Sequence, residues 1–124
     1  MNFSYLLSAC DKYAPDDRKC VCINNAIFVQ DSAWATKGVG AKTNNPCNMR
    51  PAGENSPILA GVHVALGNGN FAKFSTLRDG VEACVELYAR KYRGKSPSTI
   101  VAVWAQTTSP GYHGAVANCF TSIP

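Results

Sequence analysis

Apolar side chains recur at helical spacing near the start of the chain and predict two helices there. Residues 3–14 form a short amphipathic stretch that stops at Pro15, since proline cannot continue a helix. Asp16-Asp17 then offers an N-cap and negative first-turn charge for a second helix over about 17–34. Its apolar residues fall at 20, 23, 27 and 34, and the same stripe includes Asp31. This carboxylate is therefore expected to face inward.

The middle of the chain predicts a long irregular segment followed by a β-hairpin. Residues 36–57 are rich in Gly, Asn, Thr and Pro, and loops of this length in a compact domain are usually functional. Residues 61–66 and 71–75 alternate between apolar and polar. Gly67-Asn68-Gly69-Asn70 between them supplies the positive φ angles that a hairpin turn requires.

Helical spacing returns after the hairpin. Asp79 is expected to cap a helix over 80–93, with Glu82 and Glu86 on its outer face. The expected inner face consists of positions 81, 84, 85, 88 and 92.

Two more helices are expected at the end of the chain. One begins at Ser98-Thr99 and runs to about Gln106, with Ile100, Val103 and Trp104 facing inward. The last, about 112–120, follows Pro110-Gly111. The pattern predicts an α+β fold that is mostly α-helical with one small β-hairpin.

Length and cysteine content add a disulfide framework to this picture. At 124 residues the chain is expected to form a single domain, 1–124. Its six cysteines, an even number in a short chain, indicate disulfides in an oxidising compartment, although free thiols remain an alternative. The spacing Cys20-Val21-Cys22 is too tight for a usual zinc site, and His63 and His113 are isolated. We expect no metal and no cofactor.

The charge is mildly basic, with a formal net charge of +4. The cations are scattered except over 90–95, which suits either a solvated helix end or attraction to an anionic polymer such as a bacterial envelope. This is not the clustered footprint of a nucleic-acid-binding protein. No segment is long enough for a transmembrane helix, so stable membrane insertion is not expected. A monomer is expected.

The N-terminal segment lacks the features of a signal peptide. Residues 1–7 have neither a basic n-region nor a full apolar h-region. Together with the expected disulfides, this predicts an extracytoplasmic protein, in the periplasm or cell wall, that leaves the cytoplasm by another route. Cell lysis or transport within a phage particle would provide such a route.

Asp31 is the residue whose placement carries chemistry. Desolvation raises the pKa of a buried carboxylic acid, which allows it to stay protonated near neutrality and act as a general acid. The alternative is a structural Asp that bonds a nearby loop amide. A carboxylate at a helix C-terminus is unfavourable for the helix dipole, which weakens a purely stabilising role.

The order of motifs around Asp31 resembles the lysozyme-like glucosaminidases and related phage muramidase domains. Those domains have a helix ending in a pattern like Glu-Ser-Gly-Trp-Gly, an Asn-rich loop, a strand of the type Phe-x-x-Tyr/Phe-x-Ser and a late Asp-Pro-x-Tyr segment. The corresponding segments here are Asp31-Ser32-Ala33-Trp34, Thr43 to Arg50, Phe71 to Ser75, and Ser109-Pro110-Gly111-Tyr112. The resemblance covers about 20–120. Asp31 stands where the family has Glu, which draws the acid back by about 1.5 Å.

The resemblance implies a lysozyme-like fold and cleavage of the glycan strands of bacterial peptidoglycan, by hydrolysis or lytic transglycosylation. Asp31 would protonate the leaving glycosidic oxygen, and Tyr112 would line the cleft. Glycosidases usually use a second carboxylate, for which Glu54 is the best candidate. Tyr112 and Glu54 also have non-catalytic interpretations: Tyr112 could be a half-buried aromatic residue at a helix start, and Glu54 could be an exposed loop residue.

Four further residues match positions near the family's cleft. Trp34 could stack on a sugar, or it could be a core residue. Asn45, Asn48 and Arg50 match the loop and strand beside the cleft, although Asn is also common in turns.

Two other functions remain open. A peptidoglycan amidase could use Cys47 with His63 or His113, whereas a non-catalytic wall-binding or virion structural domain could keep the fold without turnover.

Overall fold

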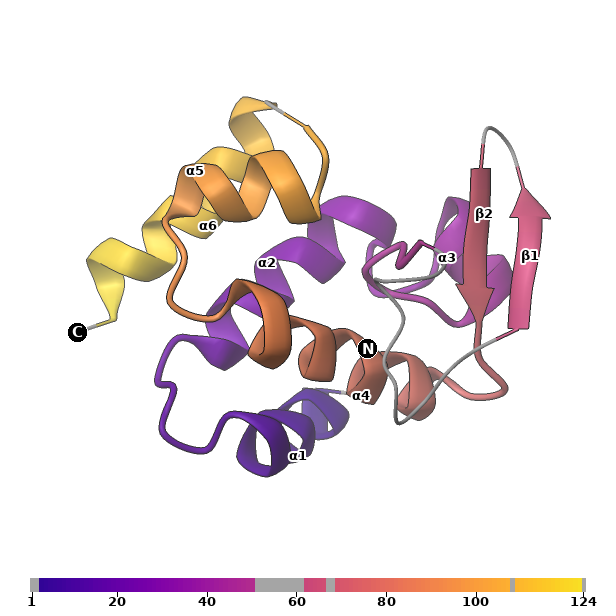
Figure 1. Ribbon diagram of the computed structural model, residues 1–124, viewed down its shortest axis with the longest axis horizontal. Helices are drawn as coiled ribbons and strands as arrows, with labels where there is room; N and C mark the ends of the chain where they lie inside the picture. The colour runs from indigo at the N-terminus through magenta and orange to yellow at the C-terminus, as the bar shows by residue number, and fades with distance from the viewer. Residues whose placement is uncertain (1–2, 51–61, 67–68, 108, 124) are drawn as a thin grey trace.

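The computed structural model describes residues 3–50, 62–66, 69–107 and 109–123, with only the backbone described for 62–66, 69 and 70. The described elements, in chain order, are α1 (Phe3–Tyr13), α2 (Cys20–Ser32), α3 (Gly38–Thr43), β1 (Val62–Leu66), β2 (Gly69–Lys73), α4 (Leu77–Leu87), the π-helical turn η1 (Tyr88–Tyr92), α5 (Pro97–Thr99), the π-helical turn η2 (Ile100–Trp104) and α6 (Pro110–Ser122). The predicted α+β class, mostly helical with one small hairpin, is confirmed (Figure 1).

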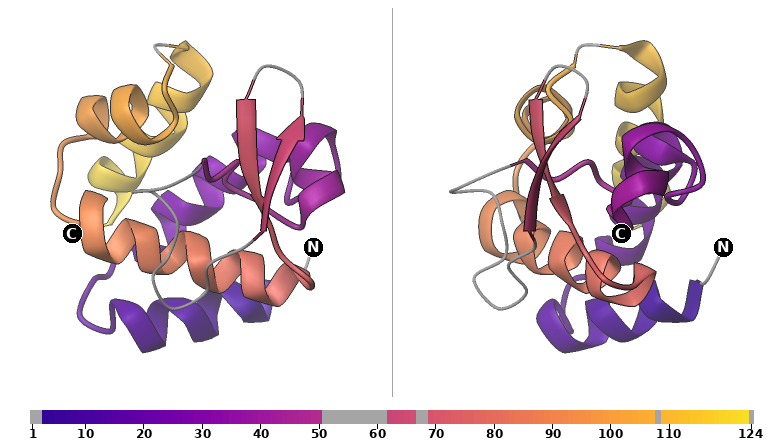
Figure 2. Two further views of the ribbon diagram at one scale, coloured as in Figure 1. Left: turned by 45° about the vertical axis from the view of Figure 1, so that its right-hand side comes forward. Right: turned by 90° about the vertical axis from the view of Figure 1, so that its right-hand side faces the viewer.

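Helix α2 runs through the middle of the molecule, with the other helices around it. Helices α1 and α4 lie side by side on one flank, whereas α5 and α6 lie on the other (Figures 1 and 2). Ile23, Ile27 and Phe28 on α2 are each at most 1% exposed and join one hydrophobic core with residues of α1, α4 and α6. The amphipathic spacing in the sequence therefore reflects burial against several helices at once.

The starts of two helices differ from the predicted ones. Helix α2 begins at Cys20 rather than at 17, and Asp17 accepts a hydrogen bond from the Lys19 backbone N–H (2.9 Å) in the preceding turn. The N-cap of α4 is Thr76, whose side chain accepts from the Asp79 backbone N–H, so the predicted Asp79 cap is wrong. Only α4 has a side-chain cap, in which the Thr76 oxygen satisfies one of the free N–H groups of the first turn.

The predicted inner face of the long helix after the hairpin is correct, and its outer face is partly wrong. All five inner positions are buried: Val81, Cys84, Val85, Tyr88 and Tyr92. Glu86, however, is also buried, at 6% exposed.

A second misplacement follows in η2. Val103 is 51% exposed, and Val101 is buried instead. Because η2 has π-helical hydrogen bonding, the α-helical spacing used to place Val103 does not hold there.

The segment 36–57, predicted to be wholly irregular, contains the short helix α3. Gly40 lies within this helix, where an added Cβ would stand 2.5 Å from the Cβ of Ser32. Its glycine therefore serves close packing between α3 and the end of α2. The Thr43 hydroxyl donates to the Val39 carbonyl (2.7 Å), which satisfies this buried polar side chain within the helix.

The predicted hairpin is confirmed as an antiparallel pair in which Val62 lies opposite Lys73 and Leu66 opposite Gly69. The second strand was predicted over 71–75 but spans Gly69–Lys73, so Gly69 and Asn70 are paired strand residues rather than part of the turn. The second strand is also fixed to the segment that follows α3. The Ala72 backbone N–H donates to the Met49 carbonyl (3.0 Å), and the Phe74 N–H donates to the Thr43 carbonyl (2.8 Å). These bonds place the hairpin beside α3 and the end of α2.

The six cysteines form three disulfides, as the framework prediction required: Cys10–Cys20, Cys22–Cys119 and Cys47–Cys84. The first joins α1 to α2, the second joins α2 to α6, and the third joins the segment after α3 to α4. Each therefore ties together elements that enclose the core.

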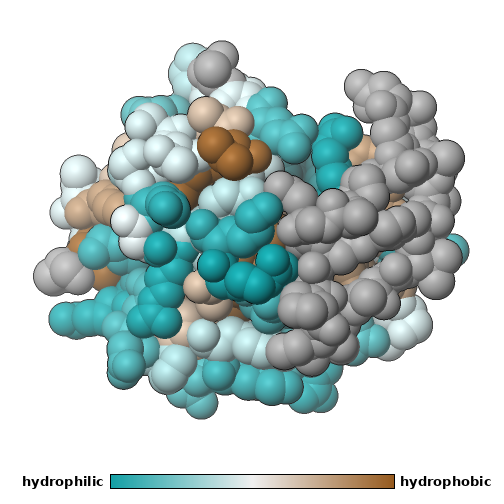
Figure 3. Space-filling view, in the orientation of Figure 1, coloured by the Kyte–Doolittle hydropathy of each residue, from teal (hydrophilic) through white to brown (hydrophobic). Residues whose placement is uncertain are grey.

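The surface visible in Figure 3 is mostly hydrophilic, with hydrophobic residues exposed in small separate areas. The exposed large hydrophobic side chains among the described residues are Phe3, Leu7, Val29 and Val103. No described helix combines the length and the hydropathy needed to cross a membrane.

Replacing both Cys22 and Cys119 by Ser is expected to lower the free energy of unfolding by about 2–5 kcal/mol. The bridge spans 97 residues of sequence, so its loss restores much conformational freedom to the unfolded chain. Denaturant titration measured by circular dichroism would give the difference. An unchanged midpoint would contradict this role for the bridge.

Candidate active site

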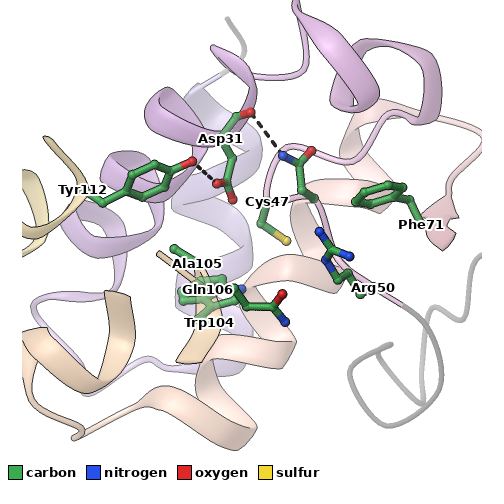
Figure 4. A pocket seen from close by; sticks show the side chains of 9 residues that line it. Asp31, Cys47, Arg50, Phe71, Trp104, Ala105, Gln106 and Tyr112 are labelled. Atoms are coloured by element: carbon green, nitrogen blue, oxygen red, sulfur yellow. Dashed lines mark hydrogen bonds between the residues drawn. The ribbon is translucent and has the colours of Figure 1, made fainter. Parts of the chain in front are cut away.

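A pocket of about 190 Å³ lies where the end of α2, the segment after α3, the hairpin, the end of η2 and the start of α6 meet (Figure 4). Its lining residues are Asp31, Cys47, Asn48, Arg50, Phe71, Trp104, Ala105, Gln106 and Tyr112. The pocket is therefore lined by residues up to 81 positions apart in the sequence.

Asp31 and Tyr112 form the polar pair on one side of this pocket. Asp31 occupies the last turn of α2, and Tyr112 lies in the first turn of α6. The Tyr112 hydroxyl donates a hydrogen bond to Asp31 Oδ1 (Figure 4). Both side chains are half-buried, so the carboxyl group reaches the pocket while most of its surroundings are protein.

Burial raises the pKa of Asp31 from 3.8 to about 7, because desolvation penalises its charged form. The hydrogen bond from Tyr112 acts in the opposite direction and lowers that pKa. The same contact, together with burial, raises the pKa of Tyr112 above its ordinary value of 10, so the phenol keeps its proton. Near neutral pH the pair can therefore offer a carboxylic acid held in place by a neutral donor.

The segment after α3 forms the wall next to Asp31. The Asn48 side-chain amide donates to the Asp31 backbone carbonyl at 3.2 Å, which gives the end of α2 a polar partner. Further along, the Arg50 guanidinium carbon lies 4.9 Å from the centroid of the Phe71 ring. Cation–π attraction of this kind fixes a guanidinium over an aromatic face.

Left-handed backbone conformations concentrate around the pocket. The described non-glycine residues with positive φ are Ala33, Trp34, Ala35, Asn44, Asn48 and Gln106. Asn48 and Gln106 line the pocket, and the first three directly follow Ser32 at the end of α2. Asparagine adopts this conformation readily, whereas each alanine or tryptophan in it costs roughly 1 kcal/mol or more, and conformations of this kind cluster at functional sites.

Hydrogen bonds hold the left-handed run after α2 in place. The Ser32 hydroxyl accepts from the Ala35 backbone N–H and donates to the Pro46 carbonyl, both at 2.8 Å. Ser32 is 3% exposed, so these bonds are made in a largely dry environment. The turn that follows Asp31 is thereby tied to the segment after α3.

Two buried polar atoms of the pocket wall have no hydrogen-bond partner. They are Asn48 Oδ1, an acceptor, and Trp104 Nε1, a donor; the described residues contain only two other atoms of this kind, on Tyr13 and Asn24. Buried polar groups are normally paired. Both atoms have almost no accessible surface, so they lie behind the pocket surface rather than on it.

Of the site residues predicted from the sequence, the structure brings together four: Asp31, Tyr112, Asn48 and Arg50. Glu54, the predicted second carboxylate, lies outside the described residues. Asp31 is the only carboxylate among the described lining residues.

The predicted sugar-stacking role of Trp34 is wrong. Its side chain is 3% exposed and packs edge-on against Phe28 with ring centroids 5.1 Å apart. Its indole N–H donates to the Asn25 side chain at 2.9 Å. Trp34 is therefore a core residue, which was the alternative interpretation from the sequence.

The predicted substrate contact by Asn45 is also wrong. Asn45 is 0% exposed, and its amide N donates to the Met49 carbonyl (3.0 Å) and the Ala72 carbonyl (2.9 Å). Its Oδ1 accepts from the Met49 backbone N–H at 2.8 Å. The bonds to Met49 fix the turn of the segment, and the bond to Ala72 holds it against β2.

Cys47 cannot be the nucleophile of an amidase in this form of the protein, since its sulfur is bonded to Cys84. His113 is exposed and is not a lining residue of the pocket. Within the described part of the chain, no three His, Cys, Asp or Glu residues gather as a metal site would require.

Phe71, Trp104 and Gln106 line the pocket but were not predicted as site residues. The motif order placed Phe71 on the strand after the loop, which could have suggested its proximity to Arg50. Trp104 was predicted to face the core, and its ring does stack on Tyr92 with ring centroids 5.1 Å apart. That prediction gave no reason to expect it in the pocket as well. For Gln106, whose backbone is left-handed, the sequence carries no local signal.

Comparison with protein-family models, curated proteins and solved structures finds no match to this chain.

Asn45→Ala is expected to destabilise the fold by roughly 2–4 kcal/mol, because it leaves a buried N–H and a buried carbonyl without partners. Asn44→Ala is a useful comparison, since Asn44 makes one side-chain bond, to the Phe74 carbonyl at 3.0 Å, from a half-buried position. Denaturant titration measures both. An Asn45→Ala protein as stable as the wild type would contradict this structural role for Asn45.

Asp31→Asn is expected to stabilise the protein above pH 7 by roughly 2–4 kcal/mol and to have little effect near pH 4. The folded state holds the Asp31 proton more tightly than the unfolded chain does, because the folded pKa is about 7 against 3.8. Stability of the wild type therefore falls as pH rises between these values, whereas the Asn variant lacks this loss. Melting temperatures at a series of pH values measure it, with exposed Asp11→Asn as control. A difference independent of pH would refute the assignment.

Proposed function

We propose that this chain cleaves the glycan strands of bacterial peptidoglycan, with Asp31 as the general acid that protonates the leaving glycosidic oxygen. The observation that carries the proposal is the half-buried Asp31, with a pKa of about 7, bonded to Tyr112 inside a pocket. A general acid works best when its pKa lies near the operating pH.

The backbone after Asp31 supports the resemblance on which the substrate class rests. The glucosaminidase pattern Glu-Ser-Gly-Trp-Gly has glycines at the positions of Ala33 and Ala35. These two alanines have φ of 48° and 59°, a conformation that glycine adopts without strain. The turn that the family's glycines favour is thus present here with alanine in their place.

The pocket's polar groups also suit an amino sugar. The N-acetyl group carries one carbonyl acceptor and one N–H donor, and the pocket lining includes the polar side chains of Asn48, Arg50 and Gln106. The pocket volume of about 190 Å³ is below the roughly 300–1,000 Å³ of pockets for drug-sized ligands. We infer that it holds one sugar ring of a longer strand.

In the proposed reaction the glycosidic C–O bond breaks as the Asp31 carboxyl proton passes to the leaving oxygen. Tyr112 fixes the carboxyl group in position and stays protonated. The positive charge that develops on the sugar can be met by the substrate's own N-acetyl oxygen, so that one protein carboxylate suffices. Water or a hydroxyl of the same sugar then forms the new bond to the anomeric carbon and returns its proton to the Asp31 carboxylate, which completes hydrolysis or transglycosylation. Mass spectrometry of the fragments distinguishes these products.

The predicted extracytoplasmic location, in the periplasm or cell wall, follows from the same proposal. The three disulfides support it, because disulfides persist in oxidising compartments. Release on lysis or transport within a phage particle remains part of the proposal, as does the monomeric state.

Asp31→Asn is expected to lower the release of new saccharide ends from purified peptidoglycan by at least about 100-fold. The amide keeps the shape of the side chain but has no acidic proton to give. Asp11→Asn, which removes the same charge from an exposed position on α1, should keep full activity. Clearing that survives in Asp31→Asn would reject Asp31 as the acid.

Tyr112→Phe is expected to move the alkaline limb of the pH–rate profile upward. The Tyr112 hydroxyl lowers the pKa of Asp31, so its removal raises that pKa and keeps the acid protonated at higher pH. Activity falls as pH rises through the pKa, in the wild type around pH 7. A limb that stays in place or moves downward would contradict this role for Tyr112.

A wall-binding domain without turnover is the second candidate, favoured by the presence of a single carboxylate among the described lining residues. Co-sedimentation with peptidoglycan without any new saccharide ends would support it.

A further inference from the structure

The pocket is polarised, with an acid on one side and a cation on the other. Figure 4 shows Asp31 and Tyr112 on one side, whereas Arg50 and Phe71 lie on the opposite side. The general-acid step uses the first side only, which leaves the role of the cationic side open.

Arg50 has no anionic partner within the described part of the chain. The ion pairs found there involve Lys12, Arg78, Arg90 and Arg93, each with a carboxylate other than Asp31. The cation of Arg50 is instead held over the Phe71 ring at 4.9 Å. Its half-buried position beside the 5% exposed Phe71 restricts the water around it.

A guanidinium that rests on an aromatic face keeps its in-plane N–H groups free. These donors have a fixed fork geometry that matches the two oxygens of a carboxylate. Asp31 does not supply that carboxylate, because its Oδ1 is bonded to Tyr112 and no ion pair joins it to Arg50. A ligand that occupies the pocket can supply the carboxylate partner for Arg50.

We propose that Arg50, positioned by Phe71, binds a carboxylate carried by the sugar in the pocket, so that the site selects acidic over neutral amino sugars. The inference rests on the proposed saccharide substrate and adds the basis of selection within it. Asp31 and Arg50 then engage different groups of one ligand, the glycosidic oxygen and the acidic substituent.

Two carboxylates of a peptidoglycan strand fit this description. One is the lactyl carboxylate of N-acetylmuramic acid that bears no peptide, and the other belongs to the peptide attached there. Both present the same planar anion, so their sources must be separated by the choice of ligand.

The test is a nuclear magnetic resonance titration of the intact, disulfide-bonded protein with monosaccharides, which contain no bond to be cleaved. The ligands are N-acetylglucosamine, N-acetylmuramic acid and N-acetylmuramyl dipeptide, whose lactyl group is amidated. We expect an acidic ligand to bind roughly tenfold more tightly than N-acetylglucosamine, as one charge-assisted interaction allows. Tighter binding of N-acetylmuramic acid or of the dipeptide identifies which carboxylate is bound.

Arg50→Gln should remove this preference, so that the acidic sugars bind no more tightly than N-acetylglucosamine. Arg50→Lys keeps the charge without the planar fork and should retain part of the preference. Arg18→Gln is the matched control, since Arg18 is exposed and does not line the pocket. Spectra of each variant before titration show whether it is folded.

Equal affinity for acidic and neutral sugars in the wild type would overturn the inference, as would a preference that survives in Arg50→Gln. Absence of binding by all three ligands would overturn it too. The outcome is separate from that of the proposed function: the acidic preference can stand in a protein that cleaves nothing, and Asp31-dependent cleavage can be found without the preference.

Discussion

The buried side-chain amide of Asn45 is the interaction on which the pocket depends. It bonds Met49 through both its backbone groups and reaches the Ala72 carbonyl of β2, all within a site at 0% exposure. These bonds fix the course of the chain from Asn45 to Arg50. Asn48 is thereby held against the Asp31 carbonyl and Arg50 against Phe71. A residue that never meets the ligand thus positions two residues that line the pocket.

Neighbouring contacts leave this segment little freedom to move. Cys47 is bonded to Cys84 on α4, and Pro46 accepts from the Ser32 hydroxyl at the end of α2. A Cβ on Gly80 would come within 1.8 Å of the Asn44 carbonyl oxygen, so α4 packs here at a distance that only glycine permits. Because the segment is joined to α2, β2 and α4 at once, the relative positions of these elements and of the pocket wall are set together.

The sequence predicted what depends on local periodicity, and it failed where a distant contact decides. Spacing alone predicted the buried face that includes Val81 and Tyr88, and it placed Asp31 inward. Asn45 reads locally as a turn residue, since its partner Ala72 lies 27 positions away. Two further errors have nearby partners: Trp34 packs on Phe28 after the left-handed turn that ends α2, and Glu86 is buried with Arg90 Nε 2.7 Å from its Oε1. The resemblance implied that Asp31 and Tyr112 share one cleft, but their hydrogen bond was not predicted, because no periodicity connects residues 81 positions apart.

The site weakens the fold that contains it. A carboxyl group with its pKa raised to about 7 is less favourable in the folded state than in water at higher pH, and the left-handed run Ala33 to Ala35 adds backbone strain. Marginal stability leaves little room for such costs in a domain of this size. The Cys22–Cys119 bridge, which begins on α2 and ends on α6, acts on the two helices that carry Asp31 and Tyr112. By keeping those helices together, it both offsets the loss of stability and preserves the contact that gives Asp31 its orientation.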